Sequence, residues 1–437
     1  MDPRSILLAA HPTVGHTGAL RAIGAELRAR GHATGFALVH ARVPFASRWP
    51  EPVQAAARLP AAIASEGAEV LALKASPAAL WHAARLPRAT GQAELEIALA
   101  LFTSGLEAQA RELAAHARAR RAAVVVGDYL MPAALLGAQL AGLPFAAVYH
   151  SALPFAAEGA PPFGTDLPAS EQGGAAWQEA EARLARMGAR FDARLALAAA
   201  RLGLPPPGEG RLLRPISPDL NLLATAPELE PGLGPLAGPV RMVGPCLPRA
   251  AALDAGAQAV LDALPRGRSI VYVSLGTVFN DQPAVFRALI RGAAATGAHV
   301  VVSAGASLAA LADLRSDSVQ LHRRVPQVPL LAQVDVVITH GGNNTVQECL
   351  AAGRPMVVIP FGGDQRANAH RVERLGVGVR RSAAELSASS IAAALASLSA
   401  PEVRARAEQL ARGLAGHGGA PAAADAVLAL AAAGPRR

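Results

Sequence analysis

The chain has 437 residues, of which 52% are hydrophobic, so it is longer than one ordinary domain and carries apolar material for two sizeable cores. Its formal net charge of +8 comes mainly from scattered arginines, and no Lys/Arg run of the nucleic-acid type is present. We therefore interpret the charge as solvated surface with some bias toward anionic substrates, and we expect no nucleic-acid partner.

The sequence also argues against a secreted or membrane-spanning protein. Residues 1–10 contain a strand-like run followed by a histidine, which is not the layout of a signal peptide. No run of 18 residues is apolar enough to span a bilayer. Cys246 and Cys349 are too few and too isolated for a disulfide framework or a zinc site. We expect a cytoplasmic protein, and the sequence leaves its oligomeric state open.

The first half of the chain alternates predicted strands and helices. A buried strand at 6–10 is followed by the loop HPTVGHT, a helix from about Gly18 to Arg30 and a second strand at 33–39. This order is typical of a doubly wound α/β sheet, which binds ligands at the carboxyl ends of its strands. Further strands are predicted at 122–127, 144–150, 214–226 and 240–243, and helices within 50–120, including one long helix at 94–120, and at 177–202.

The second half restarts the same alternation after a Pro/Gly-rich stretch at 227–248. Strands are predicted at 269–274, 299–303, 319–322, 334–339 and 356–360, and helices at 283–294, 345–352, 403–413 and 422–433. We therefore predict an α/β protein with two doubly wound, Rossmann-like parallel sheets. The expected domains are 1–235 and 269–415, with a linker at 236–268 and a last helix within 416–437.

The stretch from Arg324 to Gln365 carries the clearest functional pattern. The segment HGGNN at 340–344 has turn composition and separates a predicted strand from a predicted helix. Thr345 and Glu348 have the spacing of a capping box, so we expect the helix to begin at or beside Thr345. Helix N–H groups beside two glycines predict an anion site, most naturally for phosphate.

An ordinary turn before a helix is the commoner explanation for two glycines alone. The combination with flanking polar residues favours a binding site, because His340 and Asn344 bracket the glycines and Glu348 follows one turn inside the helix. Asp364 and Gln365 then follow the next predicted strand.

This stretch resembles the nucleotide-sugar donor signature of the family 1, UDP-dependent glycosyltransferases, in particular the bacterial branch that modifies macrolides, other polyketides and carotenoids. The plant form reads W-x-P-Q, H-C-G-W-N-S-x-x-E and D/E-Q. Here the corresponding residues are Arg324-Val-Pro-Gln327, His340-Gly-Gly-Asn-Asn-Thr345-Val-Gln-Glu348 and Asp364-Gln365. Arg324 replaces the tryptophan that stacks on the base, although a guanidinium plane can also stack, and the link from Gln327 to His340 is shorter.

The resemblance implies the GT-B architecture, with two Rossmann-like domains facing across a cleft and a last helix that crosses back to the first domain. It implies that Gln327, with Arg324 and Val325, holds the base, that Glu348 holds the ribose, and that Asp364 and Gln365 hold the sugar hydroxyls. An N-cap is the alternative role for Asp364. The implied phosphate contacts are Ser274, Gly276, Thr277, His340, Gly342, Asn343, Asn344 and Thr345.

His16 is the candidate general base. It lies in the loop after the first predicted strand, at the start of a helix whose dipole disfavours imidazolium, so the ring stays neutral and able to accept a proton. The family's catalytic histidine occupies this place in a G-H pair, here Gly15–His16, and Asp128 matches the aspartate that orients it. His11 is the competing base in the same loop, and helix capping is the alternative role for Asp128.

The resemblance implies an inverting, metal-independent enzyme that transfers a hexose, most directly glucose from UDP-glucose, to a hydroxyl of a lipophilic polyketide, macrolide or carotenoid. No metal is expected, because the helix start, His340 and hydroxyl groups can stabilise the diphosphate. Thymidine diphosphate donors fit the same pattern. A nucleotide-sugar epimerase and a non-catalytic sugar-nucleotide-binding protein are the alternatives. An oxidoreductase is disfavoured because no G-x-G-x-x-G follows the first strand.

Overall fold

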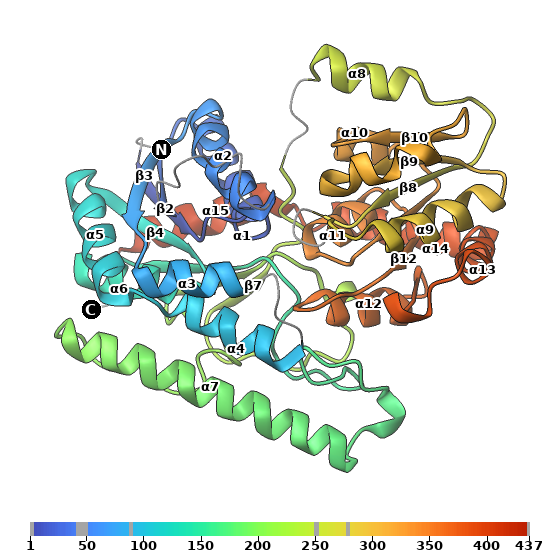
Figure 1. The fold of residues 1–437 in the computed structure, drawn as a ribbon. Helices are drawn as coiled ribbons and strands as arrows, with labels where there is room; N and C mark the ends of the chain where they lie inside the picture. Colours follow the sequence, from blue (N-terminus) through green and yellow to red (C-terminus); the bar gives the residue numbers. More distant parts are fainter. Residues whose placement is uncertain (1–3, 41–50, 87–90, 249–252, 277–279, 435–437) are drawn as a thin grey trace. The chain divides into compact units, whose positions relative to one another are not determined.

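The computed structural model describes residues 4–40, 51–86, 91–248, 253–276 and 280–434. The chain forms two compact units, the first being Met1–Pro248 with His417–Arg437 and the second Arg249–Gly416. Each unit consists of one parallel sheet with helices packed against it (Figure 1).

The first unit holds seven parallel strands in the order β3-β2-β1-β4-β5-β6-β7. The strands are β1 (Ser5–Ala10), β2 (Ala33–His40), β3 (Glu69–Lys74), β4 (Ala122–Asp128), β5 (Phe145–Tyr149), β6 (Leu220–Leu223) and β7 (Val240–Met242). The helices are α1 (Val14–Ala29), α2 (Glu51–Ser65), α3 (Pro77–Arg85), α4 (Gly91–Phe102), α5 (Leu106–Ala119), α6 (Pro132–Ala141), α7 (Ala175–Arg201) and α15 (Gly419–Ala433).

The apolar run in β1 is continuous because both faces of this sheet are covered. Leu7 and Ala9 belong to a core cluster that includes residues of α5, α6 and α7. Ile6 and Leu8 point to the other face, where they pack with residues of α1 and α15. Side chains alternate between the faces along a strand, so a strand buried on both sides has no polar alternation.

The last helix of the chain completes the first unit. Ala424 and Val427 of α15 are buried in the same cluster as Leu8, and Arg30 at the end of α1 donates to Asp425 Oδ1 at 2.5 Å. The segment from His417 onward therefore packs on the first sheet although it follows the second unit in sequence.

The second unit holds six parallel strands in the order β10-β9-β8-β11-β12-β13. The strands are β8 (Ile270–Ser274), β9 (His299–Ser303), β10 (Val319–His322), β11 (Val336–Thr339), β12 (Met356–Val358) and β13 (Gly378–Arg380). The helices are α8 (Ala255–Asp262), α9 (Pro283–Ala295), α10 (Gln327–Leu331), α11 (Asn343–Ala351), α12 (Gln365–Arg374), α13 (Ala388–Leu398) and α14 (Pro401–Ala415).

The predicted fold class, an α/β protein with two doubly wound parallel sheets, is confirmed. In each sheet the strand order reverses at one point, between β1 and β4 in the first unit and between β8 and β11 in the second. Ligands of such sheets bind beside the carboxyl ends of the strands at this reversal. The two reversal points therefore locate the candidate sites.

Several predicted boundaries were wrong. The long helix at 94–120 is two helices, α4 and α5, because Gly105 adopts φ 77° and ends the helical path. The strand expected at 214–226 is limited to β6, and the expected linker at 236–268 contains β7 and α8. Helix α13 was not predicted.

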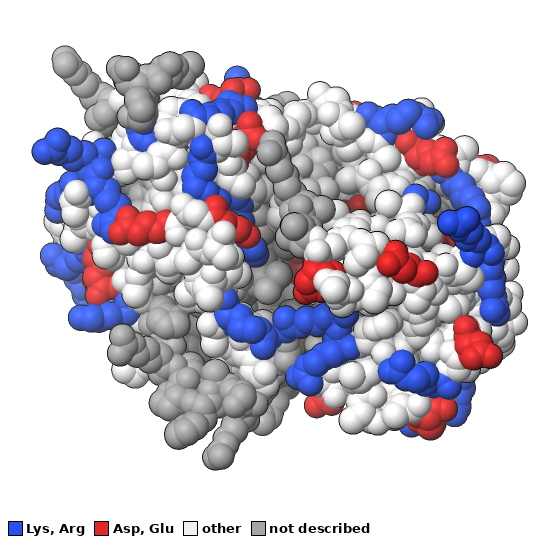
Figure 2. Space-filling view, turned by 90° about the horizontal axis from the view of Figure 1, so that it is seen from above, with Lys and Arg blue, Asp and Glu red and all other residues white. Residues whose placement is uncertain are grey.

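The charged side chains of the described surface are mixed. Figure 2 shows basic and acidic residues interspersed with uncharged ones over the face that it draws. Among the described residues, no helix combines the length and apolar composition that a membrane crossing requires.

His299 gives a prediction about stability. Its ring is 3% exposed, and neither ring nitrogen has a hydrogen-bond partner among the described groups. Unpaired buried polar atoms cost roughly 1–3 kcal/mol, so we expect His299→Leu to raise the free energy of unfolding by about 1 kcal/mol at about pH 8. Burial lowers the pKa of His299 from 6.5, with Arg268 adding to the effect. The unfolded chain alone takes up this proton as the pH falls below 6.5, so the gain should be larger at about pH 5.5.

Denaturant unfolding of the full chain at both pH values, followed through the transition of the unit that carries each substitution, measures this effect. His32 provides the matched control, because it is equally buried but its Nδ1 accepts a hydrogen bond from the Arg4 backbone N–H at 3.1 Å. We expect His32→Leu to lose stability. A loss of stability in His299→Leu at both pH values would contradict the prediction.

Candidate functional site

The carboxyl ends of β1 and β4 bring the two predicted catalytic residues together. Thr13 is the N-cap of α1, and its hydroxyl oxygen accepts a hydrogen bond from the His16 backbone N–H at 3.3 Å. The helix therefore begins at Val14, and the predicted start at Gly18 was wrong. His16 lies in the first turn of α1, beside the end of β4, because β1 and β4 are neighbours in the sheet.

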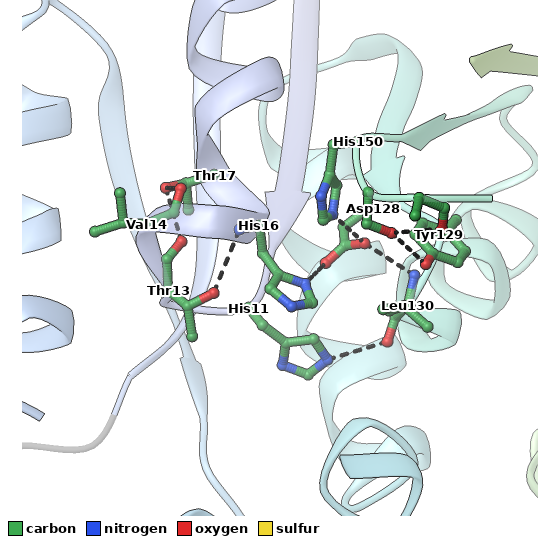
Figure 3. Close-up of polar contacts among 11 residues, drawn as sticks. His11, Thr13, Val14, His16, Thr17, Asp128, Tyr129, Leu130 and His150 are labelled. Atoms are coloured by element: carbon green, nitrogen blue, oxygen red, sulfur yellow. Dashed lines mark hydrogen bonds and ion pairs between the residues drawn. The ribbon is translucent and has the colours of Figure 1, made fainter. Parts of the chain in front are cut away.

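His16 Nδ1 lies 2.6 Å from Asp128 Oδ2 (Figure 3). A carboxylate accepts hydrogen bonds, so Nδ1 carries the proton and Nε2 of the neutral ring is left as the proton acceptor. Asp128 is 0% exposed, and its Oδ1 also accepts the Leu130 backbone N–H at 2.9 Å. This arrangement has the base-and-orienter geometry used in general base catalysis.

Asp128 keeps its charge although it is fully buried. Burial by itself raises the pKa of this carboxyl, but the charges and hydrogen bonds of His16 and His150 outweigh it and hold the pKa well below its usual range. A buried carboxylate needs such donors, because an unpaired charge in the interior is costly. The alternative prediction was that Asp128 caps the following helix. That helix, α6, begins at Pro132 and has no side-chain cap, so Asp128 does not cap it.

The competing histidine, His11, is held differently. It is buried, and its Nε2 lies 3.2 Å from the Leu130 carbonyl oxygen, so that nitrogen donates to the backbone. Its ring packs against Phe102 with a centroid separation of 4.8 Å. Burial lowers the pKa of His11 to about 4, so the ring is neutral near pH 7. These contacts are typical of a histidine packed in the protein core.

His150 is a residue of this site that the sequence analysis missed. It follows β5, and its Nε2 lies 2.9 Å from Asp128 Oδ1. Figure 3 shows the rings of His16 and His150 both directed at the Asp128 carboxylate. The one signal in the sequence was a histidine at the end of a predicted strand, and its relevance depends on β5 being the neighbour of β4.

His16, Asp128 and His150 together offer three potential metal ligands. Their nitrogen and oxygen atoms lie within 4.8 Å of one another. Two ligands of a tetrahedral zinc ion at 2.0–2.1 Å are roughly 3.3 Å apart. The His16 and His150 nitrogens lie instead at 2.6 and 2.9 Å from separate carboxylate oxygens, so the cluster has the spacing of hydrogen-bonded groups.

The reversal point of the second sheet holds the predicted phosphate contacts. Ser274 ends β8, and His340 follows the neighbouring strand β11. The His340 ring lies beside two glycines. A Cβ added to Gly276, whose φ is 72°, would lie 2.5 Å from the ring, and one added to Gly342 would also lie at 2.5 Å. Glycine is therefore required at both positions to leave room for this imidazole.

His340 is a neutral ring near pH 7, because burial lowers its pKa to about 4. It can therefore donate one hydrogen bond without carrying a charge. Thr277, which was predicted beside it, lies outside the described residues.

Helix α11 begins closer to the glycines than predicted. It starts at Asn343, with Gly342 at the N-cap and no side-chain capping bond, so the predicted capping box of Thr345 and Glu348 was wrong. Thr345 is instead the third helical residue, and the Glu348 carboxylate accepts a hydrogen bond from Gln327 Nε2 at 2.6 Å. The first turn of α11 therefore follows directly on the His340-Gly-Gly turn, which is the geometry of an anion site.

The predicted base and ribose contacts lie together. Gln327, the first residue of α10, donates to Glu348 Oε2 and at 3.2 Å to Thr345 Oγ1. The Tyr272 hydroxyl donates to Gln327 Oε1 at 2.8 Å, a contact that the sequence did not indicate. Burial raises the pKa of Glu348, and the hydrogen bond from Gln327 opposes this rise. Arg324 is exposed and Val325 half-buried just before α10.

The predicted sugar contacts adjoin the phosphate turn. Asp364 is the N-cap residue of α12 but makes no side-chain capping bond. Gln365 Oε1 accepts the backbone N–H groups of Phe361 and Gly362, at 2.8 and 3.3 Å. Asn368, which was not predicted, ties the two loops together, because its Nδ2 lies 2.9 Å from the Gly341 carbonyl oxygen and 3.5 Å from Asp364 Oδ2.

A buried arginine supports the same region. Arg371 is largely buried in α12, and its Nη1 lies 3.3 Å from Asn343 Oδ1 and 3.2 Å from Asn368 Oδ1. It therefore joins α12 to the first residue of α11. The positive charge lies close to the helix start where an anion would bind.

Comparison with known proteins agrees with this geometry. Residues 254–405 match the family model described as UDP-glucoronosyl and UDP-glucosyl transferase. The oleandomycin glycosyltransferase of Streptomyces antibioticus is 36% identical over 162 residues, which make up 36% of this chain and 37% of that protein. The zeaxanthin glucosyltransferase of Pseudescherichia vulneris is 26% identical over 386 residues, or 85% of each protein.

The solved structure of the glycotransferase of kitacinnamycin superposes with a TM-score of 0.72 at 25% identity, covering 98% of this chain and 100% of that one. The chain spans less than half the length of the oleandomycin enzyme in their alignment. The family match includes every predicted donor residue from Ser274 to Gln365. Residues 254–405 are therefore similar to the UDP-glycosyltransferase family, and the chain as a whole has the GT-B fold of the natural-product glycosyltransferases.

Proposed function

We propose that the protein is an inverting glycosyltransferase that moves a hexose from a nucleoside diphosphate sugar to a hydroxyl of a lipophilic natural product. The hydrogen bond of 2.6 Å between His16 and the buried Asp128 carries this proposal. It leaves Nε2 of a neutral imidazole as the proton acceptor, which an alcohol nucleophile requires. Relatives named for oleandomycin and zeaxanthin support a natural-product acceptor.

The reaction is a single displacement. The acceptor oxygen attacks C1 of the sugar while His16 Nε2 takes the hydroxyl proton. The bond from C1 to the diphosphate oxygen breaks with its electron pair, and the configuration at C1 inverts. Asp128 stabilises the imidazolium that forms. The N–H groups of the first turn of α11 and the neutral ring of His340 bind the diphosphate and take up its charge.

The donor we propose is UDP-glucose. In this assignment Gln327, with Arg324 and Val325, holds the uracil, Glu348 holds the ribose, and Asp364 and Gln365 hold the sugar hydroxyls. The Gln365 carbonyl oxygen is already used by the loop 361–362, so the amide NH2 is the group assigned to the sugar. This division leaves Gln365 both a structural and a binding role.

Gln365 therefore gives a test of donor choice. A sugar that lacks the matching hydroxyl leaves a binding group unpaired, which costs about 1–3 kcal/mol or roughly 5–150-fold. We expect wild type to prefer UDP-glucose over a thymidine-linked 6-deoxyhexose at equal concentration, and Gln365→Ala to lose much of this preference. Competition between the two donors, followed by mass spectrometry of the products, measures both ratios. Unchanged selectivity in the variant would remove Gln365 from the sugar site.

The diphosphate contacts also predict independence from divalent metal ions. Protein groups supply the charge stabilisation in this mechanism, so transfer should continue at an undiminished rate in excess EDTA. The measurement is the initial rate of UDP release before and after chelation and after adding back magnesium or manganese. A strict requirement for either ion would refute this part of the mechanism.

UDP release with and without acceptors separates the proposed function from its alternatives. A glycosyltransferase releases UDP in proportion to glycosylated product. An epimerase converts the sugar nucleotide without releasing UDP, and an accessory protein binds it without turnover. A panel of macrolide, aromatic polyketide and carotenoid acceptors, with products identified by mass spectrometry, gives the readout. Tight UDP-glucose binding with no transfer to any acceptor would favour the accessory role.

A further inference from the structure

The second histidine on Asp128 is not used in the mechanism above. His150 is 4% exposed and follows β5, the strand next to β4 on the side away from β1. Three neighbouring strands thus deliver His16, Asp128 and His150 to one place through their carboxyl ends. His150 is a buried polar side chain in contact with the proposed catalytic pair, so its presence there needs a physical explanation.

The hydrogen bonds define what His150 does to the carboxylate. Asp128 Oδ2 accepts a hydrogen bond from His16 Nδ1. Asp128 Oδ1 accepts two hydrogen bonds, one from His150 Nε2 at 2.9 Å and one from the Leu130 backbone N–H at 2.9 Å. Two donors on one oxygen fix the rotation of the carboxylate. The other oxygen is thereby held toward the His16 ring. Loss of His150 leaves the Leu130 N–H as the remaining described donor on Oδ1.

His150 also shares the charge that Asp128 offers to His16. Every donor on a buried carboxylate draws negative charge toward itself, and charged hydrogen bonds are strong in a medium of low dielectric constant. With fewer donors on Oδ1, Oδ2 would stabilise the His16 imidazolium more. The two imidazole rings also pack together, with centroids 4.8 Å apart at 63°.

We propose that His150 is a positioning residue for the transfer reaction, which acts through Asp128 to orient His16 and to limit its basicity. This inference rests on the proposed function, because it assigns His150 to the same reaction. The other described titratable groups around the cluster are His11 after β1, Tyr129 after β4 and Tyr149 at the end of β5. The Tyr129 hydroxyl bonds Ser151, and its ring centroid lies 5.8 Å from that of His150.

The effect on pH dependence has a definite sign. Removing the donor at His150 strengthens the interaction of Asp128 with the His16 imidazolium. His16 then holds its proton to higher pH, and the base is blocked over a wider acid range. The midpoint of the acid limb of kcat/KM should therefore move upward by about 0.5–1 pH unit. A purely structural role for His150 would lower activity without moving this midpoint.

Two substitutions isolate the donor from the shape of the ring. His150→Phe keeps a ring against His16 but removes the N–H, and we expect kcat/KM to fall roughly 10–100-fold with the upward shift of the acid limb. His150→Gln keeps an amide N–H near the position of Nε2, so most of the activity and the wild-type acid limb should return. UDP affinity should be unchanged in both variants, because the predicted donor residues lie in the other unit.

A double-mutant cycle tests whether His150 acts through Asp128. If it does, His150→Phe should lower activity by much less in an Asp128→Ala background than in wild type. Equal loss in both backgrounds would overturn the proposal. So would a wild-type pH profile in a folded His150→Phe variant, or equal defects in His150→Phe and His150→Gln when both are folded and bind UDP.

A spectroscopic measurement tests the role of His150 without an acceptor substrate, and it can be made on a second variant if His150→Phe does not fold. Protein labelled with ¹⁵N-histidine reports the titration of the His16 ring, whose signal is identified by its absence in His16→Ala. We expect the His16 midpoint to rise in His150→Phe, or in His150→Leu if the first variant does not fold, and to return in His150→Gln. An unmoved midpoint overturns the positioning role. If the His16 midpoint shifts as expected but wild type transfers no sugar, the proposed reaction is refuted and the positioning role of His150 is not.

Discussion

Replacing His16 with alanine should reduce sugar transfer by roughly 10²–10⁴-fold while leaving UDP binding unchanged. The loss follows from the geometry of the pair, because His16 Nδ1 is bound to Asp128 and Nε2 is the nitrogen that can accept the acceptor proton. UDP binding should persist because the predicted nucleotide contacts lie in the second unit, on α10, α11 and the loops beside them. Initial rates and calorimetric titration with UDP measure the two effects separately.

The choice of acceptor sharpens this test. An acidic phenol that is already ionised needs no base, so His16→Ala should be much less impaired with it than with an aliphatic alcohol. His11→Gln is the matched control, because glutamine can still donate to the Leu130 carbonyl and His11 is a packed core residue in the same loop. Equal losses with both acceptors, or a larger loss in His11→Gln than in His16→Ala, would contradict the assignment of the base.

Replacing His340 with alanine should lower kcat by roughly 10²–10³-fold, the loss typical of removing one donor from a developing negative charge. The ring lies between Ser274–Gly276 and the start of α11, in the space that two glycines leave for it. Because burial lowers its pKa to about 4, His340 acts as a neutral donor, and its contribution should not vary between about pH 5.5 and 8. The measurement is kcat across this range at saturating donor, together with UDP affinity.

His322 offers the matched control for this variant. It also ends a strand of the second sheet, β10, but this is the edge strand and lies away from the reversal between β8 and β11. We expect His322→Ala to keep its rate and UDP affinity. His340→Gln should recover part of the activity because an amide can also donate. Normal kcat in a folded His340→Ala variant would remove this residue from the diphosphate site.

The fold class and the candidate donor residues could both be predicted from the sequence because both are recorded in local patterns. The continuous apolar run of β1 predicts a strand buried on both faces, and repeated alternation of such strands with helices predicts a doubly wound sheet. The spacing of His340, Gly342, Glu348 and Gln365 is likewise local, because one strand, one helix and two turns hold all four. Their placement around one turn requires only that the consecutive strands β11 and β12 pair in parallel.

The pair of His16 and Asp128 was predicted from a resemblance, and the tertiary structure shows how the pair forms. The two residues are 112 positions apart and meet at 2.6 Å because β4 inserts beside β1, with β2 and β3 on the other side. Strand order is set by the packing of whole sheets, and the hydrophobic periodicity of a single segment does not indicate it. His150 could not be placed on Asp128 without the knowledge that β5 is the next strand in that order.

Helix boundaries were decided by single contacts that periodicity does not reveal. Thr13 caps α1 four residues earlier than the apolar pattern indicated, and Gly105 at φ 77° divides what the composition presents as one long helix. Glu348 had the right spacing for a capping box, but Gln327 lies 2.6 Å from its carboxylate and takes that bond. The sequence by itself predicted most of the strands and helices and one candidate anion-binding turn. The order of the strands, the partners of buried carboxylates and the ends of helices were decided by the tertiary structure, because each depends on contacts between segments distant in the chain.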